Sequence, residues 1–164
     1  RGEWPVRTAH DDHAATESLD EAVSVVVVDL TDDVFDIDQT LDRQETDGIT
    51  FETAALVEHR GQAGKRLDSY LSKPVSNDEL RATVERLNRR VRYDRLLGRY
   101  YAVASEYAET ASGEGHAPPE LARLQERLFT LRKRLDEIVD GLDDVDAFDA
   151  ALGEYDDTDD FSLR

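Results

Sequence analysis

Two short groups of residues in this chain have side chains that could hold an ion or a charged ligand. The first is the segment His10-Asp11-Asp12-His13, which places two imidazoles and two carboxylates side by side. These residue types bind divalent metal ions. Acids at this density are also typical of a helix N-terminus, where they cap free N–H groups and favour the positive end of the helix dipole. We favour the helix start and predict no metal site.

The second group is the densest basic region of the chain, with three tyrosines close by. Its arginines are Arg86, Arg89, Arg90, Arg92, Arg95 and Arg99, and the tyrosines are Tyr93, Tyr100 and Tyr101. Clustered arginines can neutralise DNA phosphates, or they can pair with acids on a neighbouring helix, such as Glu126, Asp136 and Glu137. No helix-turn-helix pattern accompanies them. We therefore expect pairing within or between subunits, and the alternative is a DNA-binding regulator that uses this arginine patch.

Other common kinds of site have no counterpart in the sequence. The chain has no cysteine, which excludes disulfides, thiolate metal sites and a cysteine nucleophile. No Ser/His/Asp set, glycine-rich phosphate loop or zinc-ligand spacing occurs. The sequence therefore predicts a protein that is not an enzyme and has no cofactor of its own.

Charge and hydropathy indicate where such a protein folds. The net charge is -18, from 38 acidic and 20 basic residues, and lysine occurs only at Lys65, Lys73 and Lys133. Dispersed acids repel one another at low salt, so this composition is typical of proteins that fold in molar salt. No apolar run is long enough for a membrane span, and no signal pattern begins the chain. We predict a cytoplasmic protein with no membrane partner.

The N-terminal half alternates between predicted strands and helices. The run VSVVVVDL, residues 23–30, lacks alternation and predicts a strand buried on both faces of a parallel sheet. Further strands are predicted at 5–9, 49–57 and 67–71, with helices beginning at Asp11 or Asp12 and spanning about 33–44. This order predicts an α/β fold with a parallel sheet.

The C-terminal half predicts two long helices. Ser76 and Glu79 have the spacing of a capping box and predict the start of a helix that reaches about Ala111. The apolar stripe of this helix has two parts: Leu80, Val84, Leu87 and Val91, followed by Leu97, Tyr101, Ala104 and Ala108. After a Gly- and Pro-rich break, Pro119 begins a second helix. Its seam alternates spacings of three and four: Leu121, Leu124, Leu128, Leu131, Leu135, Ile138 and Leu142. We predict an antiparallel coiled-coil hairpin whose seam also serves a protein partner or a homodimer.

The segment YLSKPVSNDELRATVERLNRRVRYDRLL, residues 70–97, and the strand ending at Asp29 resemble haloarchaeal proteins that join a two-component receiver domain to a HalX domain. The resemblance implies a flavodoxin-like receiver sheet, with Asp29 as phospho-acceptor, Lys73 before a cis Pro74, and a histidine kinase as partner. It divides the chain into a receiver-like domain at 1–77, a HalX-like hairpin at 78–152 and an acidic tail at 153–164.

Several receiver features are missing from this sequence. The strand with the acidic pair that would hold Mg²⁺ is absent, so the ion is expected only if such a pair lies upstream of Arg1. The position at which receivers carry a hydroxyl residue that triggers their switch is Val57 or Glu58, and neither side chain has a hydroxyl group. The loop after Asp29 reads LTDDVFD. We interpret the first part as a degenerate or N-terminally truncated receiver. The protein is expected to act in signal transduction or transcription regulation through protein contacts, without phosphotransfer; a live phosphorelay regulator phosphorylated at Asp29 is the alternative.

Overall fold

The computed structural model describes residues 4–31, 37–58, 66–112 and 118–141. The chain divides into two compact units that meet between Asp94 and Arg95. The sequence-based division at 77/78 lies earlier, where the long helix begins. The difference has a physical cause: Leu87 and Val91, about three and four turns into that helix, have no exposed surface and belong to the core of the first unit.

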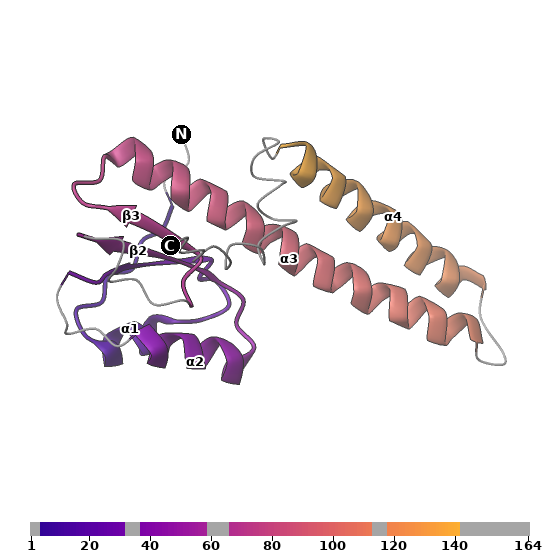
Figure 1. The fold of residues 1–164 in the computed structure, drawn as a ribbon. Helices are drawn as coiled ribbons and strands as arrows, with labels where there is room; N and C mark the ends of the chain where they lie inside the picture. Colours follow the sequence, from indigo (N-terminus) through magenta and orange to yellow (C-terminus); the bar gives the residue numbers. More distant parts are fainter. Residues whose placement is uncertain (1–3, 32–36, 59–65, 113–117, 142–164) are drawn as a thin grey trace, which may run out of the picture. The chain divides into compact units, whose positions relative to one another are not determined.

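The first unit contains a parallel sheet, as the sequence predicted, and this sheet has three strands (Figure 1). Its strands are β1 (Val25–Asp29), β2 (Glu52–Val57) and β3 (Ser69–Ser72), in the order β1-β2-β3. Ala54, at the centre, aligns with Val27 of β1 and Ser69 of β3. Since β2 is paired on both sides, its residues are the most deeply buried, and Ala54, Ala55 and Val57 are fully covered.

Two predictions for the N-terminal strands are wrong. Residues 5–9 form no strand: Val6 is 80% exposed, and Arg7 instead donates hydrogen bonds of 2.7 Å to the Ser18 carbonyl and to the Asp20 carboxylate. The run around β1 is also not buried on both faces, because β1 lies at the edge of the sheet and Val27 remains 40% exposed. A β-branched run thus predicted the strand but not its neighbours.

One face of the sheet is covered by α1 (Asp12–Ser18) and α2 (Ile37–Asp47). Asp11 caps α1 by accepting a hydrogen bond from the Ala14 N–H at 2.7 Å, as expected for an acid at the N-cap. After α2 the chain turns at Gly48, whose φ of 65° is readily adopted only by glycine. The core between these elements contains Leu19, Leu41, Ile49 and Phe51.

The opposite face is covered by the first half of α3 (Asn77–Ser112) (Figure 1). The Ser76 hydroxyl accepts a hydrogen bond from the Glu79 N–H at 3.2 Å, so one half of the predicted capping box is present. Arg86 donates a 3.0 Å hydrogen bond to the Ser69 hydroxyl. Apolar burial and polar contacts therefore both hold α3 to β2 and β3.

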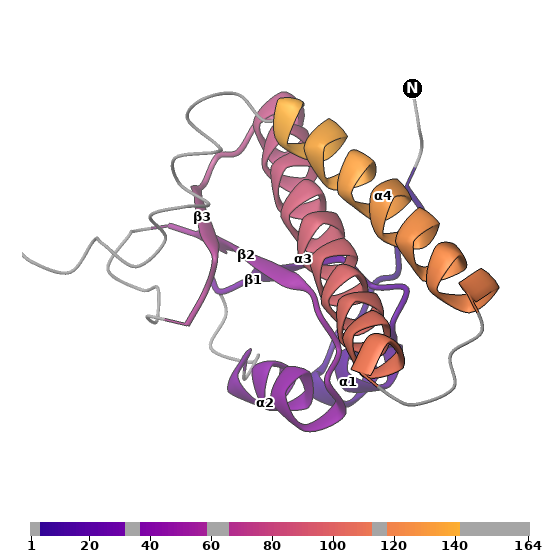
Figure 2. The same ribbon diagram turned by 90° about the vertical axis from the view of Figure 1, so that its right-hand side faces the viewer.

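The second unit contains the rest of α3 and α4 (Pro118–Asp140), which lie antiparallel as a hairpin (Figure 2). Gln125 of α4 donates a 2.9 Å hydrogen bond to the Tyr107 hydroxyl of α3. The second helix begins one residue before the predicted Pro119. No described helix is long and apolar enough to cross a membrane.

The stripe predicted for the second half of α3 is only partly buried: Leu97 and Ala104 are half-buried, whereas Tyr101 and Ala108 are exposed. Tyr101 is 62% exposed, whereas Val103 is 4% exposed and faces α4. A second set at the same spacings, Leu96, Tyr100, Val103 and Tyr107, is half-buried or buried at every position. Both sets satisfy helical periodicity, so the sequence could not choose between them.

Candidate functional site

The candidate site lies at the carboxyl ends of the strands, where Asp29 ends β1 and Lys73 follows β3. The Leu30 N–H donates to the Leu56 carbonyl at 3.0 Å, and the Lys73 N–H donates to the Val57 carbonyl at 2.8 Å. These bonds continue the parallel ladders and bring Asp29 and Lys73 to the end of the sheet at which the strands have their carboxyl ends. Because β2 separates β1 from β3 by two strand spacings, about 10 Å, only a long side chain can connect them.

The Lys73 side chain makes this connection. Its Nζ lies 2.6 Å from Asp29 Oδ2 and 2.6 Å from Thr31 Oγ1. Asp29 Oδ1 accepts two further hydrogen bonds from Thr31, one from the hydroxyl at 2.6 Å and one from the N–H at 3.0 Å. The peptide bond between Lys73 and Pro74 is cis. Both oxygens of the Asp29 carboxylate are thus engaged by the protein itself.

These contacts hold Asp29 in its charged form. The hydrogen bond from Lys73, followed by the hydroxyl hydrogen bond from Thr31, lowers the pKa of Asp29 from 3.8 to about 2. The group therefore stabilises the fold above pH 3.8 and loses this contribution as the pH falls toward about 2. The side chains of Asp29 and Lys73 are 53% and 31% exposed, so water screens the pair and its contribution to stability is small.

Thr31 is the member of this site that the sequence did not single out. The available signal was its position two residues after Asp29, a spacing at which an aspartate accepts hydrogen bonds from the following backbone and hydroxyl. We predict that Lys73→Met raises the pKa of Asp29 more than Thr31→Val does, because the lysine contact is the larger of the two. Titration of the Asp29 carboxyl carbon by NMR measures both changes. An equal rise in the pKa of Asp29 in the two variants would contradict the conclusion that Lys73 lowers this pKa more than Thr31 does.

A second polar group lies at the opposite end of β2. Glu52 is 7% exposed, its Oε1 lies 3.5 Å from the guanidinium of Arg90 in α3, and its Oε2 is buried without a hydrogen-bond partner. Burial, and next the negative charge of Asp68, raise the pKa of Glu52 to about 7. Asp68 accepts hydrogen bonds of 2.7 Å from the N–H and hydroxyl of Thr53. No sequence pattern indicated this cluster, because a glutamate before an apolar run normally lies at the surface.

The arginines of the predicted patch are divided between the two units of the chain. Arg86 and Arg90 contact Ser69 and Glu52 of the sheet, whereas Arg99 lies in the second unit and lines a groove between α3 and α4. Arg92 is exposed, and Arg89 and Arg95 are half-buried. An ion pair of 3.9 Å between the helices joins Glu106 of α3 to Arg127 of α4, so there the acid is on the first helix and the arginine on the second.

The two histidines of the first segment lie in and before α1. Asp11 serves as the N-cap, and His13 is exposed with its Nε2 3.8 Å from Glu17. Among the described residues, no three His, Cys, Asp or Glu side chains are grouped closely enough to hold a metal ion.

The leucine seam of α4 is only partly buried. Leu124 and Leu135 are 3% and 8% exposed, and the remaining described members, Leu121, Leu128, Leu131 and Ile138, are half-buried. Leu142 lies outside the described residues. A two-helix hairpin therefore leaves part of this seam accessible.

Comparison with known proteins relates the hairpin to one family. Residues 89–152 match the family model of the HalX domain, and the match begins inside α3 without including the three-stranded sheet. Searches among curated proteins and among solved structures gave no match. The resemblance noted in the sequence is thereby confirmed for the helical part. Residues 89–152 of the chain are therefore similar to the HalX domain family.

Proposed function

We propose that this protein is a non-enzymatic regulatory module of the receiver-HalX type that acts through protein contacts of its helical hairpin, without phosphotransfer at Asp29. The HalX domain relates the chain to response-regulator-type signalling proteins in a broad sense. The proposal that Asp29 accepts no phosphate depends mainly on one observation, the state of the Asp29 carboxylate.

The Asp29 carboxylate is already neutralised within the chain. In a receiver that accepts phosphate, an aspartate oxygen must attack phosphorus, and the lysine then binds the phosphoryl oxygens. Here Lys73 and Thr31 bind both oxygens of Asp29 at 2.6 Å, so attack would require these contacts to break. This arrangement supports a structural role in which Lys73 joins β1 to β3 across the end of β2.

The hairpin offers a surface for protein contacts. Phe129 of α4 is 73% exposed, and the neighbouring Leu128 is half-buried. Large apolar side chains at this exposure are favourable contact residues once a partner covers them. We propose a second copy of the chain as the partner, because a regular leucine seam of this kind associates with a matching seam.

Phosphotransfer is tested directly. The protein is incubated in high salt with Mg²⁺ and a small phosphodonor, and intact mass and acid-labile phosphate are measured, with Asp29→Asn as the control. We expect no acyl phosphate in either protein. A phosphate that forms on the natural sequence and is lost in Asp29→Asn would support the live receiver and overturn this part of the proposal.

Self-association is tested by light scattering across protein concentration in high salt. We expect a dimer, and we expect Phe129→Ala to raise its dissociation constant by about 10-fold, the effect of losing about 1.4 kcal/mol of contact energy. Thr130→Ala, at the next residue of α4, is the matched control and should change little. A protein that remains monomeric at every concentration would refute the dimer.

A further inference from the structure

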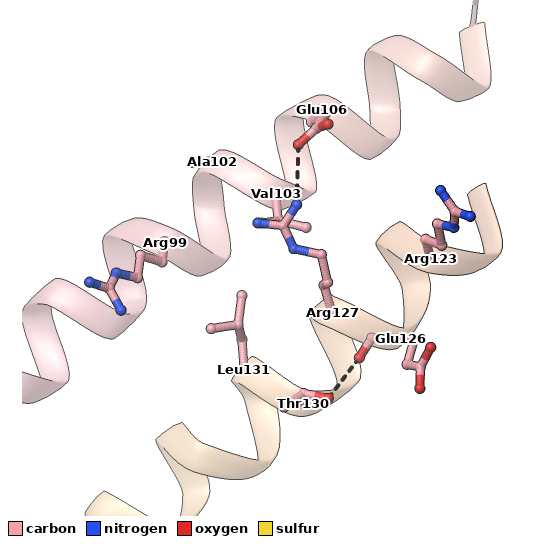
Figure 3. Close-up of a pocket in the computed structure, with 9 residues that line it drawn as sticks. All are labelled: Arg99, Ala102, Val103, Glu106, Arg123, Glu126, Arg127, Thr130 and Leu131. Atoms are coloured by element: carbon pink, nitrogen blue, oxygen red, sulfur yellow. Dashed lines mark hydrogen bonds and ion pairs between the residues drawn. The ribbon is translucent and has the colours of Figure 1, made fainter. Parts of the chain in front are cut away.

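A groove of about 810 Å³ lies between α3 and α4 within the second unit (Figure 3). Its apolar surface comes from Ala102 and Val103 of α3 and Leu131 of α4. In Figure 3 the side chains of Val103 and Leu131 point into the space between the helices. Along α4 the groove extends from Arg123 to Leu131, which is about 12 Å at 1.5 Å per helical residue. This length matches about two turns of another helix.

Three arginines lie around the apolar residues of the groove. They are Arg99 of α3 and Arg123 and Arg127 of α4, and the two acids of the lining are Glu106 and Glu126. Arg127 lies 3.9 Å from Glu106, whereas Arg99 and Arg123 are exposed and form no ion pair with any described residue. Glu126 points away from the groove in Figure 3. In a chain with a net charge of -18, the groove is thus a local site of excess positive charge.

The hairpin buries little apolar surface by itself. Among the described residues of the second unit, only Val103, Leu124 and Leu135 are less than a tenth exposed. Two packed helices cover one stripe each, and helical units of this size gain stability when a further helix packs against them. A helix that binds in the groove would therefore gain affinity from apolar contact.

Charge argues against the exposed apolar face of a second copy as the occupant. Phe129, the centre of that face, lies two residues from both Arg127 and Leu131, so its side chain points about 200° away from the groove around α4. Its neighbours one turn along the helix, Arg132 and Lys133, are exposed cations. If this face entered the groove of another copy, it would bring positive charge to the arginines there. Carboxylates at these places would instead be attracted.

We propose that the groove binds an acidic amphipathic helix of a partner protein. The apolar side chains of that helix pack on Val103 and Leu131, and its carboxylates lie beside Arg99 and Arg123. Apolar contact gives most of the affinity, and the charge pairs select an acidic partner and fix its position along the groove. This surface is separate from the Phe129 face of α4, so the inference stands whether or not the chain forms a dimer.

A synthetic peptide serves as the probe. It is two heptads long and carries leucine at positions a and d, glutamate and alanine elsewhere, and a fluorescent label. The control peptide has glutamine in place of each glutamate. Binding to the full chain is measured by fluorescence anisotropy at about 1 M salt, where the Debye length is about 3 Å and only charges in direct contact add to the affinity. We expect the glutamate peptide to bind at least about 10-fold more tightly than the glutamine peptide.

Charge reversal shows whether the peptide binds in the groove. Arg99→Glu with Arg123→Glu should weaken binding of the glutamate peptide by at least about 10-fold, because two attractive contacts become repulsive. Arg132→Glu with Lys133→Glu makes the same change in net charge outside the groove and should leave the affinity unchanged. Circular dichroism verifies that each variant keeps its helices.

Three results would overturn the proposal. The first is the absence of binding, or equal affinity for the two peptides. The second is an equal loss of affinity in the two double variants. The third is binding that Phe129→Ala abolishes and the groove variant leaves intact, since the peptide would then occupy the opposite face of α4.

Discussion

Replacing Leu87 by alanine is expected to lower the free energy of unfolding of the first unit by about 3 kcal/mol, the usual effect of deleting a fully buried leucine. Leu87 has no exposed surface and lies in the part of α3 that covers the sheet. Truncation would leave a cavity, because the central strand of the sheet that α3 covers is paired on both sides and cannot move to fill the space.

The single tryptophan provides the measurement. Trp4 lies with its ring centroid 5.7 Å from the guanidinium carbon of Arg81 in α3, so its fluorescence reports the attachment of α3 in the first unit. Chemical denaturation in high salt, followed by this signal, gives the free energy. Leu80→Ala, on the same helix at a half-buried position, is the control and should have a clearly smaller effect. A loss at Leu87 of under about 1 kcal/mol would show that this part of α3 is not held to the sheet as described.

Replacing Glu52 by glutamine is expected to stabilise the first unit by about 3 kcal/mol at pH 8 and to change little at pH 4. The reason is the raised pKa of Glu52, from 4.5 to about 7, caused first by burial and then by the charge of Asp68. Below pH 4.5 the group is protonated in both states. As the pH rises from 4.5 to about 7, the unfolded chain ionises first, so the natural protein loses stability over this range and remains penalised above it.

Glutamine keeps the shape of Glu52 and can still contact Arg90, but it carries no charge at any pH. Denaturation at pH 4, 6 and 8, again followed by Trp4, therefore separates the charge effect from a packing effect. Glu58→Gln, at the exposed position just after β2, is the matched control and should not show this pH dependence. A stabilisation of the same size at pH 4 and pH 8 would exclude ionisation as its cause.

Several features could be predicted from the sequence because local physics determines them. The apolar run before Asp29 predicted a strand, Ser76 predicted the start of α3, and the seam from Leu121 to Ile138 predicted α4. Each depends on interactions within a few residues, such as a cap or a helical repeat. The SKPVSNDEL junction and the helices after it were also sufficient to indicate the HalX family.

Tertiary structure alone decided which side chains meet. Periodicity fitted Tyr101 as well as it fitted Val103, and only the position of α4 buries Val103. In the sequence Arg86 and Arg90 belong to one basic patch, yet they contact the sheet because α3 packs on it.

Asp29 and Lys73 were recognisable from the sequence, but the hydrogen bonds that join them to Thr31 required β1 and β3 to end on the same side of the sheet. Such contacts depend on how distant segments pack, and local spacing carries no information about that packing.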